Sequence, residues 1–228
     1  MSVNIVRDAD KWVPIRRALV SVSNKTGLET LIPGLLSVNP ELHFYSTGGT
    51  FSAIQKILGP EASARHLTQV SAYTGQPETQ GGLVKTLDFK IYLGLLTETH
   101  NAAHQTDLKR TGAVALDLVV VNLYPFRETI AKSGVTPEEA RANIDIGGPC
   151  MIRAAAKNWL RVASVVDPQD YGELLRTLKA NGGKLDLATR FAFARKAFAH
   201  TAAYDQAIST YLAAQDPAAV AGLYTFHD

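Results

Sequence analysis

The stretch from Glu138 to Asn158 spaces an acid, two glycines and a lysine in a way that suits a polar ligand. Asp145 precedes the pair Gly147-Gly148. Pro149 then begins a second helical run, and Lys157 follows about two turns later. Glycines let backbone N–H groups approach a ligand, and a helix N-terminus adds partial positive charge beside them. A surface helix hairpin with two solvated charges is the alternative.

Two further clusters of polar residues follow short apolar runs that are predicted strands, in the motifs SVSNKTG and STGGT. Their hydroxyl, ammonium and glycine N–H groups come from Ser23, Lys25, Thr26, Thr47, Gly48, Gly49 and Thr50. In open parallel sheets, ligands bind where strands give way to helices, and such groups favour a phosphate there. Helix capping alone explains either motif taken by itself.

The segment 70–87 is rich in glycine, has no clear periodicity and ends in Lys85 and Thr86. A long loop of this kind inside a compact domain is typical of functional loops. A surface loop with a solvated lysine is equally compatible with the pattern.

His100 and His104 lie four residues apart in a predicted helix over 98–110, so they share one helix face. That spacing suits two metal ligands, but no cysteine or further histidine accompanies them. A solvated helix face is therefore the favoured interpretation.

Strands and helices are predicted to alternate along the chain, which indicates an α/β fold with a mainly parallel sheet. The predicted strands cover residues 18–23, 42–45, 116–123 and 162–166, and the main helices 28–36, 51–58, 98–110, 169–180 and 185–214. The run from Leu116 to Leu123 is almost continuously apolar, as in a central strand of a parallel sheet. Tyr124 follows it, so we expect this side chain at the ligand-binding edge.

Composition excludes several classes of protein. The 228 residues are 46% hydrophobic and 19% charged, as in a globular domain, and the net charge of +2 argues against nucleic acid or a membrane surface as main partner. The single cysteine, Cys150, excludes an intrachain disulfide. No apolar run reaches the roughly 18 residues of a membrane span, and no signal peptide is recognisable, so we expect a cytoplasmic protein. Residues 1–15 are expected to form a loose N-terminal extension, 16–214 the domain, and 215–228 a short tail.

A family resemblance rests on motifs that occur in order along the chain, namely SVSNKTG, STGGT, SAYTGQPE, GGLVKTL, LDLVVVNLYPF, NIDIGGPCMIRAAAKN, VVDPQDY and KAFAHTAAYD. The chain thereby resembles the inosine monophosphate (IMP) cyclohydrolase domain, the N-terminal half of bifunctional purine-biosynthesis proteins. The resemblance implies a methylglyoxal-synthase-like α/β sandwich, with helices flanking a mainly parallel sheet and a C-terminal helical segment. The usual formyltransferase domain is absent from the sequence, so we expect a stand-alone cyclohydrolase.

The family reaction closes the ring of 5-formamidoimidazole-4-carboxamide ribonucleotide, releases water and gives IMP, without a metal ion or redox cofactor. The resemblance implies that Lys85 faces the carboxamide oxygen, and that Tyr124, Asp145 and Lys157 surround the formyl oxygen. Asp145 is expected to keep Lys157 charged and oriented. The implied phosphate and ribose contacts are Ser23, Lys25, Thr26, Thr47, Gly48, Gly49, Thr50 and Thr86, and the implied base contacts are Asn122, Ile146 and Gly147.

One segment departs from the family pattern: Leu83 replaces an arginine, Asp88-Phe89 a His-Pro pair, and Tyr92 a histidine. These changes are expected to alter the wall of the base pocket. They motivate a second hypothesis, a paralogue that closes the ring of an analogous carboxamide ribonucleotide in specialised nucleoside metabolism. A third is a non-catalytic nucleotide-binding module. The apolar C-terminal helix is compatible with a homodimer, as in related proteins.

Overall fold

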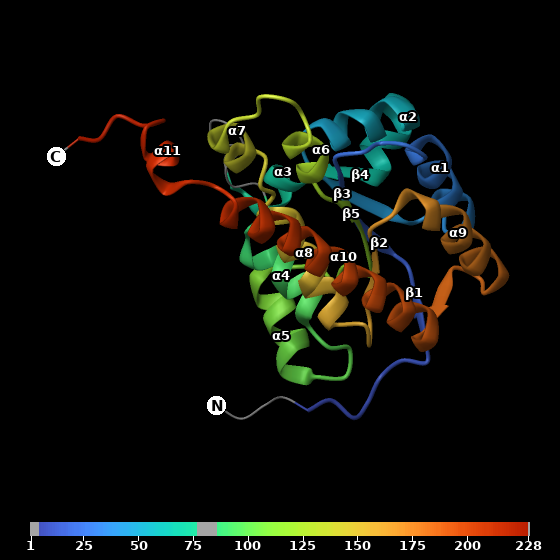
Figure 1. Cartoon of the computed structure of the whole chain (residues 1–228). Coiled ribbons are helices and arrows are strands. Elements are labelled where there is room, and N and C mark those ends of the chain that lie inside the picture. The colour runs from blue at the N-terminus through green and yellow to red at the C-terminus, as the bar shows by residue number, and fades with distance from the viewer. Residues whose placement is uncertain (1–4, 77–85, 228) are drawn as a thin grey trace.

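The computed structural model describes residues 5–76 and 86–227, and its centre is a five-stranded parallel sheet (Figure 1). The strands are β2 (Arg17–Val22), β3 (His43–Ser46), β4 (Leu67–Gln69), β5 (Leu118–Asn122) and β6 (Ala163–Val165). Their order is β4-β3-β2-β5-β6, and each strand runs parallel to its neighbours. Since β2 lies between β3 and β5, the two predicted phosphate-binding motifs follow neighbouring strands. The predicted α/β fold with a mainly parallel sheet is confirmed.

Helices cover both faces of this sheet, which explains the almost continuous apolar sequence of its central strands. Along β5, Leu118 and Val120 belong to one core, whereas Val119 and Val121 belong to the other. Successive side chains of a strand point to opposite faces, so a strand that is buried on both sides needs apolar residues at every position.

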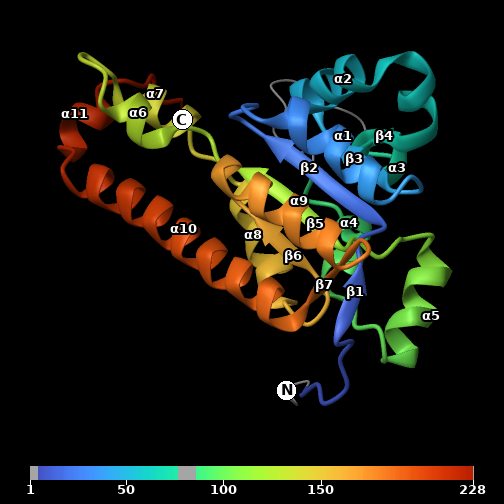
Figure 2. The ribbon, with the colours of Figure 1, turned by 90° about the vertical axis from the view of Figure 1, so that its right-hand side faces the viewer.

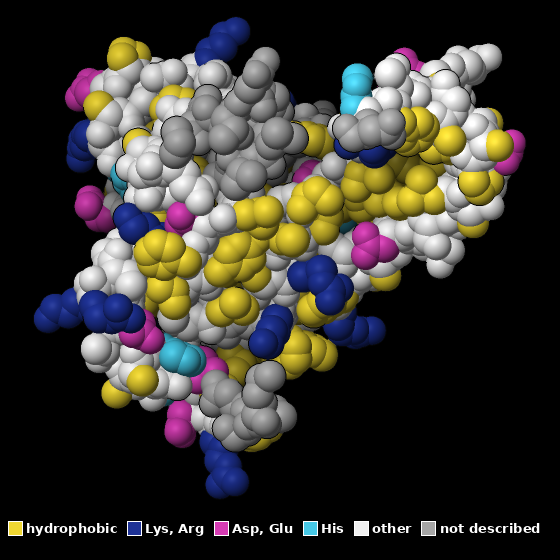
Figure 3. Space-filling model, turned by 90° about the vertical axis from the view of Figure 1, so that its left-hand side faces the viewer, with side chains coloured by type: hydrophobic (Ala, Val, Ile, Leu, Met, Phe, Trp, Pro, Cys, Tyr) yellow, Lys and Arg dark blue, Asp and Glu magenta, His cyan; other side chains and the backbone are white. Residues whose placement is uncertain are grey.

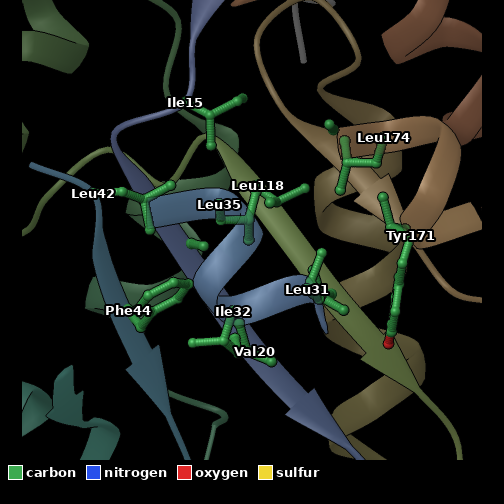
Figure 4. Packing of buried hydrophobic residues seen from close by; sticks show 14 of the residues in the cluster. Ile15, Val20, Leu31, Ile32, Leu35, Leu42, Phe44, Leu118, Tyr171 and Leu174 are labelled. Carbon is green, nitrogen blue, oxygen red and sulfur yellow. The ribbon is translucent and has the colours of Figure 1, made fainter. Parts of the chain in front are cut away.

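The first core lies between the sheet and the helices α1 (Leu28–Val38), α2 (Gly48–His66) and α9 (Tyr171–Ala180). In α1, Leu31, Ile32 and Leu35 recur at helical spacing and are fully buried against the strands (Figure 4). This packing fixes the start of α1, and with it the loop that follows β2.

The second core lies under α4 (Phe89–Leu96), α8 (Gly147–Lys157) and α10 (Leu187–Ala213). The small buried residues Ala154, Ala155 and Ala156 of α8 allow close packing against neighbouring elements. Figure 2 shows α10 running along the α8 side of the molecule. The other helical segments are α3 (Val70–Thr74), α5 (Ala102–Thr111), α6 (Phe126–Ile130), α7 (Pro137–Ala142), the 3₁₀ turn Pro168–Asp170 and α11 (Pro217–Ala221).

A two-stranded antiparallel sheet joins β1 (Trp12–Pro14) to β7 (Lys184–Asp186). Val13 and Ile15 are buried. The expectation of a loose N-terminal extension is therefore wrong for residues 12–15, because this segment pairs with a strand late in the chain. The helix predicted from residue 185 begins at Leu187, because β7 precedes it.

Hydrophobic side chains form a band on the face that α10 and the C-terminal segment occupy (Figure 3). Large apolar side chains exposed on α10 and after it are Leu187, Phe191, Leu212, Leu223, Tyr224 and Phe226. Within the described ranges, no helix is long and apolar enough to cross a membrane.

Candidate active site

A cleft of about 770 Å³ lies at the carboxyl ends of β2, β3 and β5. Figure 2 shows α2 on one side of the end of β2 and α7 on the other. The predicted site residues that line the cleft are Ser23, Lys25, Thr47, Gly48, Gly49, Thr50, Thr86, Asn122, Tyr124, Asp145, Ile146 and Gly147. The parallel topology therefore gathers residues from five separate parts of the sequence at one edge of the sheet.

The side chains that follow β3 fasten its end to β2. The hydroxyl groups of Ser21 and Thr47 lie 2.9 Å apart. The Thr50 hydroxyl accepts a hydrogen bond from the Val22 N–H at 3.0 Å and donates to the Val22 carbonyl at 3.0 Å. Thr50 is buried, and its two hydrogen bonds join the start of α2 to the end of β2. The first N–H groups of α2 have no acceptor within the helix.

Lys25 places its ammonium group beside the start of α2. A Cβ atom added to Gly49 would lie 3.8 Å from both Cε and Nζ of Lys25, and Nζ donates to the Ser23 carbonyl at 3.4 Å. An ammonium group next to the free N–H groups of a helix N-terminus makes a site for an anion. Thr26 is absent from the described lining of the cleft, and its N–H donates to Asn24 Oδ1 in a local turn.

Asn122 uses its side chain to hold the loop that carries Lys25. Its Oδ1 accepts from the Asn24 N–H at 2.9 Å, and its Nδ2 donates to the Asn24 carbonyl at 2.9 Å. Asn122 lines the cleft, but one donor and one acceptor of its amide are already engaged in positioning the phosphate end.

Asp145 lies on the opposite wall, at the start of α8. Its Oδ1 accepts a hydrogen bond from the Gly148 N–H at 2.8 Å, and its own N–H donates to the Tyr204 hydroxyl at 2.9 Å. Burial raises the pKa of the Asp145 carboxyl above its ordinary value, and the N–H groups of Gly148 and Tyr124 offset part of that rise. The carboxyl is therefore held in a fixed orientation and protonates more readily than an exposed aspartate.

The two glycines at the start of α8 allow close contacts that a side chain would prevent. A Cβ on Gly148 would lie 2.6 Å from both Asp145 Oδ2 and Leu123 Cδ2. A Cβ on Gly147 would lie 2.7 Å from the hydroxyl oxygen of the buried Thr86. Both positions therefore need glycine because of these close contacts. Their backbone conformation does not require it, because neither residue has a positive φ.

Tyr124 and Ile146 line the same cleft with exposed side chains, at 50% and 60% of their full accessibility. Tyr124 follows β5, as expected. Its phenol is therefore available to a ligand rather than engaged in the core.

Lys157 is not brought to the cleft. It is exposed in the last turn of α8, whereas Asp145 precedes the first turn, and a helix rises about 1.5 Å per residue. Asp145 and Lys157 form no ion pair, although the structure describes both residues. The expected pairing of these two side chains within one chain is therefore wrong. Lys85 lies outside the described residues.

Comparisons with known proteins support the family resemblance. Residues 35–150 match the MGS-like domain, and residues 155–227 match the AICARFT/IMPCHase bienzyme family. The chain belongs to the MGS-like domain family. Within it, the chain corresponds to the IMP cyclohydrolase part of bifunctional purine-biosynthesis proteins, so the resemblance is confirmed.

Two curated relatives are each named "Bifunctional purine biosynthesis protein PurH". The protein of Magnetococcus marinus is 48% identical over 202 residues, which cover 89% of this chain and 36% of the relative. The protein of Desulfitobacterium hafniense is 49% identical over 199 residues, which cover 87% of this chain and 36% of that relative. The chain thus spans about a third of the length of these relatives. A solved structure titled "Crystal structure of ForH" is 31% identical with a TM-score of 0.72, covering 85% of this chain and 95% of that one.

The residues that depart from the family pattern do not line the described part of the cleft. Asp88 is buried and caps α4, because its Oδ1 accepts from the Lys90 N–H at 2.8 Å. Phe89 begins α4 with an exposed side chain, and Tyr92 packs against the second core near Cys150. Asp88, Phe89 and Tyr92 are therefore absent from the described lining, Leu83 lies outside the described residues, and the expected change in the pocket wall stays a prediction.

Among the described lining of the cleft, two residues with polar side chains, Ser21 and Arg141, were missed from the sequence. Ser21 lies in β2, two positions before Ser23, so continuing the alternation of the strand would have placed both on one face. Arg141, in α7, lines the wall that leads to Asp145. No pattern in the sequence distinguishes Arg141 from a solvated arginine.

The two histidines predicted to share a helix face each have a partner, and His100 precedes α5 and so does not lie on that helix. His100 Nε2 lies 3.1 Å from Asp10 Oδ1, and His104 Nδ1 accepts from the Glu98 N–H at 3.2 Å. In the parts of the chain that the structure describes, no group of three or more His, Cys, Asp and Glu side chains is arranged to hold a metal ion.

Proposed function

We propose that this domain catalyses the ring-closing dehydration of 5-formamidoimidazole-4-carboxamide ribonucleotide to IMP, a step of purine biosynthesis. The observation that carries the proposal is the cleft itself. It combines an anion site beside Lys25 with an oriented carboxyl group at Asp145, in a chain that belongs to the MGS-like family. A ribonucleotide has a phosphate at one end and a reacting base at the other, which matches these two ends.

The proposed reaction joins the carboxamide nitrogen to the formyl carbon, and the loss of the formyl oxygen as water leaves a C=N double bond to the former formamide nitrogen, with no net oxidation or reduction. The carboxamide nitrogen attacks the formyl carbon, and the formyl oxygen becomes a hydroxyl group. That hydroxyl then leaves as water. The two hydrogens of the water come from the carboxamide nitrogen and the formamide nitrogen. Since no electrons are transferred to another molecule, the step needs no redox cofactor, and protein donors suffice to stabilise the developing oxyanion.

The phosphate is proposed to bind between Lys25 and the first turn of α2. The N–H groups of Gly48 and Gly49 supply donors there, and the ammonium group of Lys25 supplies charge. Ser23, Thr47 and Thr86 line the path to the base end. This anchoring would hold the two reacting groups of one molecule close together, which lowers the entropic part of the barrier.

Asp145 and Tyr124 are proposed to move protons at the base end. Burial moves the pKa of the Asp145 carboxyl upward, toward neutral pH. A general acid or base is most effective when its pKa is near the pH at which the enzyme works. The exposed Tyr124 hydroxyl can donate to the formyl oxygen as it gains charge. Lys85, which the family resemblance places at the carboxamide oxygen, completes the proposed set.

Ring closure creates a purine chromophore, so ultraviolet absorbance follows it directly. Rapid conversion of the formamido ribonucleotide by purified protein would support the proposal. Conversion of an analogous carboxamide ribonucleotide instead would favour the altered-substrate hypothesis. Tight nucleotide binding without turnover of either compound would favour a binding module.

A homodimer through the apolar band along α10 is part of the proposal (Figure 3). The exposed Phe191 and Leu212 lie on this helix, and their burial against a second copy would be favourable. Light scattering coupled to size exclusion measures the mass. A monomer at micromolar concentration would contradict this part.

A further inference from the structure

We propose that Tyr204 is a positioning residue that holds Asp145 and Tyr124 in place at the base end of the cleft. This inference rests on the proposed function, because these are the two residues proposed to move protons there. Tyr204 lies on α10, within the motif KAFAHTAAYD, and is absent from the described lining of the cleft. It therefore acts through other residues and not by contact with the substrate.

The Tyr204 hydroxyl binds the backbone between α7 and α8. Its oxygen accepts a hydrogen bond from the Asp145 N–H at 2.9 Å, and the hydroxyl donates to the Asn143 carbonyl at 3.4 Å. Burial raises the pKa of this hydroxyl, so it stays neutral and keeps its proton for the carbonyl. Both bonds reach main-chain atoms, so they fix the path of the loop itself. The Gly148 N–H then orients the carboxyl that this loop carries.

The ring of Tyr204 packs on the segment that carries Tyr124. It lies edge-on to Phe126, with ring centroids 6.1 Å apart and an angle of 66° between the ring planes. Phe126 is buried, and its N–H donates to the Tyr124 carbonyl at 2.8 Å. α10 packs against α6, which begins at Phe126, and Figure 2 shows the C-terminal half of α10 on the side of α6 and α7. The ring therefore restrains the backbone next to Tyr124.

A third contact joins the two positioned residues to each other. The Tyr124 N–H donates a hydrogen bond to the Asp145 carboxyl. Tyr204, Asp145 and the segment 124–126 thus form a closed set of contacts, in which one buried side chain of α10 fixes two segments that are distant in the sequence. Proton transfer requires groups within hydrogen-bond reach, and a misplacement of about 1 Å can cost up to about a hundredfold in rate. A residue that fixes this geometry is therefore expected to affect kcat.

The test uses Tyr204→Phe, which removes the hydroxyl and keeps the ring. Tyr211→Phe is the matched control. Tyr211 is half-buried on the same helix, and its ring packs against the same Phe126, with centroids 5.9 Å apart and an angle of 88°. Among the described residues, the Tyr211 hydroxyl has no hydrogen-bond partner. The two variants therefore differ in whether the lost hydroxyl held the loop of Asp145.

Steady-state ring closure and calorimetric binding of IMP and ribose 5-phosphate measure the effect. We expect Tyr204→Phe to lower kcat about tenfold and the IMP:ribose 5-phosphate affinity ratio about threefold, with ribose 5-phosphate affinity within about twofold of wild type. The phosphate end should not respond, because it lies at the start of α2 and Tyr204 does not contact it. Tyr211→Phe should change none of these values.

Amide hydrogen exchange followed by NMR tests the contact without any activity. The Asp145 N–H precedes α8 and is nevertheless expected to be protected in the wild type, because the Tyr204 oxygen accepts from it. Tyr204→Phe should speed its exchange by about fivefold to tenfold, and Tyr211→Phe should leave it unchanged. Urea denaturation of each variant confirms that the protein compared is folded.

Unchanged kcat and an unchanged affinity ratio in folded Tyr204→Phe would overturn the inference, as would an unprotected Asp145 N–H in the wild type. An equal loss of affinity for ribose 5-phosphate would also overturn it, because the effect would then be a general one on the fold. If the wild type binds IMP but closes no ring, the proposed function fails, and the affinity ratio and the Asp145 exchange rate decide on Tyr204 alone.

Discussion

Asp145 and Lys157 lie at opposite ends of α8, with Asp145 facing the cleft and Lys157 exposed in the last helical turn. The carboxyl of Asp145 is instead oriented by the Gly148 N–H at 2.8 Å. The acid and the lysine of the motif NIDIGGPCMIRAAAKN therefore lie in different surroundings within one chain. The acid lines the cleft, and the lysine is exposed at the other end of the helix.

Replacing Lys157 by alanine should leave turnover within about threefold of the wild-type value, because surface substitutions away from a site have small effects. Steady-state ring closure measures this. A loss of about a hundredfold would contradict the assignment and would indicate that Lys157 reaches a cleft in another copy of the chain.

Gly148→Ala should destabilise the domain by about 1–3 kcal/mol and abolish most activity. The added Cβ would meet Asp145 Oδ2 and Leu123 Cδ2 at 2.6 Å, and overpacking of this kind costs stability. Gly172→Ala in α9 is the matched control, since a Cβ there meets nothing within 4 Å. That control should be neutral or stabilising by up to about 1 kcal/mol. Urea denaturation compares them, and equal stability of the two variants would contradict the close contact.

Lys25→Ala should weaken substrate binding, with KM raised by about tenfold to a hundredfold and kcat reduced much less, because the phosphate does not change during the reaction. Lys56→Ala tests for a general effect of lost charge, since Lys56 is exposed on α2 and does not line the cleft. A fall in kcat at unchanged KM for Lys25→Ala would place this lysine at the reacting end instead.

Asp145 should make stability depend on pH. Burial raises the pKa of its carboxyl in the folded protein above the ordinary value, so the folded state binds this proton more readily than the unfolded chain does. Its contribution therefore stabilises the fold most at low pH, and it is lost as pH rises through the folded-state pKa.

Asp145→Asn removes this titration and keeps an oxygen that can accept from Gly148 N–H. The free energy of unfolding of the variant minus that of the wild type should increase from about pH 4 to about pH 7. Urea titrations at both pH values measure it. If this difference in unfolding free energy decreased from pH 4 to pH 7, the folded protein would stabilise the ionised carboxylate of Asp145, and its pKa would be lowered instead of raised.

The central strands could be predicted because burial on both faces leaves a clear apolar run. β5 is an example, with Leu118, Val119, Val120 and Val121 all buried. The short strands β1 and β7 could not be predicted, because each has three residues and is stabilised by a partner about 170 positions away in sequence. Their pairing depends on tertiary contacts.

The burial of Arg190 likewise could not be predicted from the sequence. Its guanidinium donates to the carbonyl oxygens of Asp10, Trp159 and Leu160, which joins the N-terminal segment to the start of α10. An arginine in a helical sequence is normally expected at the surface. Only the folded arrangement of three distant carbonyl groups makes its burial favourable.

The phosphate end of the candidate site was predictable because polar residues follow two strands, and parallel strands end at one edge of the sheet. The base end was harder, because it depends on the direction of side chains on α7 and α8. Arg141 is among the described residues that line the cleft and Lys157 is not, and both are basic residues in helical sequence. The rise along α8 separates Lys157 from the cleft, and a motif does not convey that distance.

The most direct test of the proposed function is ring closure of 5-formamidoimidazole-4-carboxamide ribonucleotide, followed by ultraviolet absorbance with the wild type and Asp145→Asn side by side. The account predicts rapid conversion by the wild type and a loss of at least about a hundredfold in the variant, with both proteins folded and able to bind IMP. Folded wild-type protein that binds IMP without converting the formamido nucleotide would contradict it, and equal turnover in the two proteins would contradict the role of Asp145.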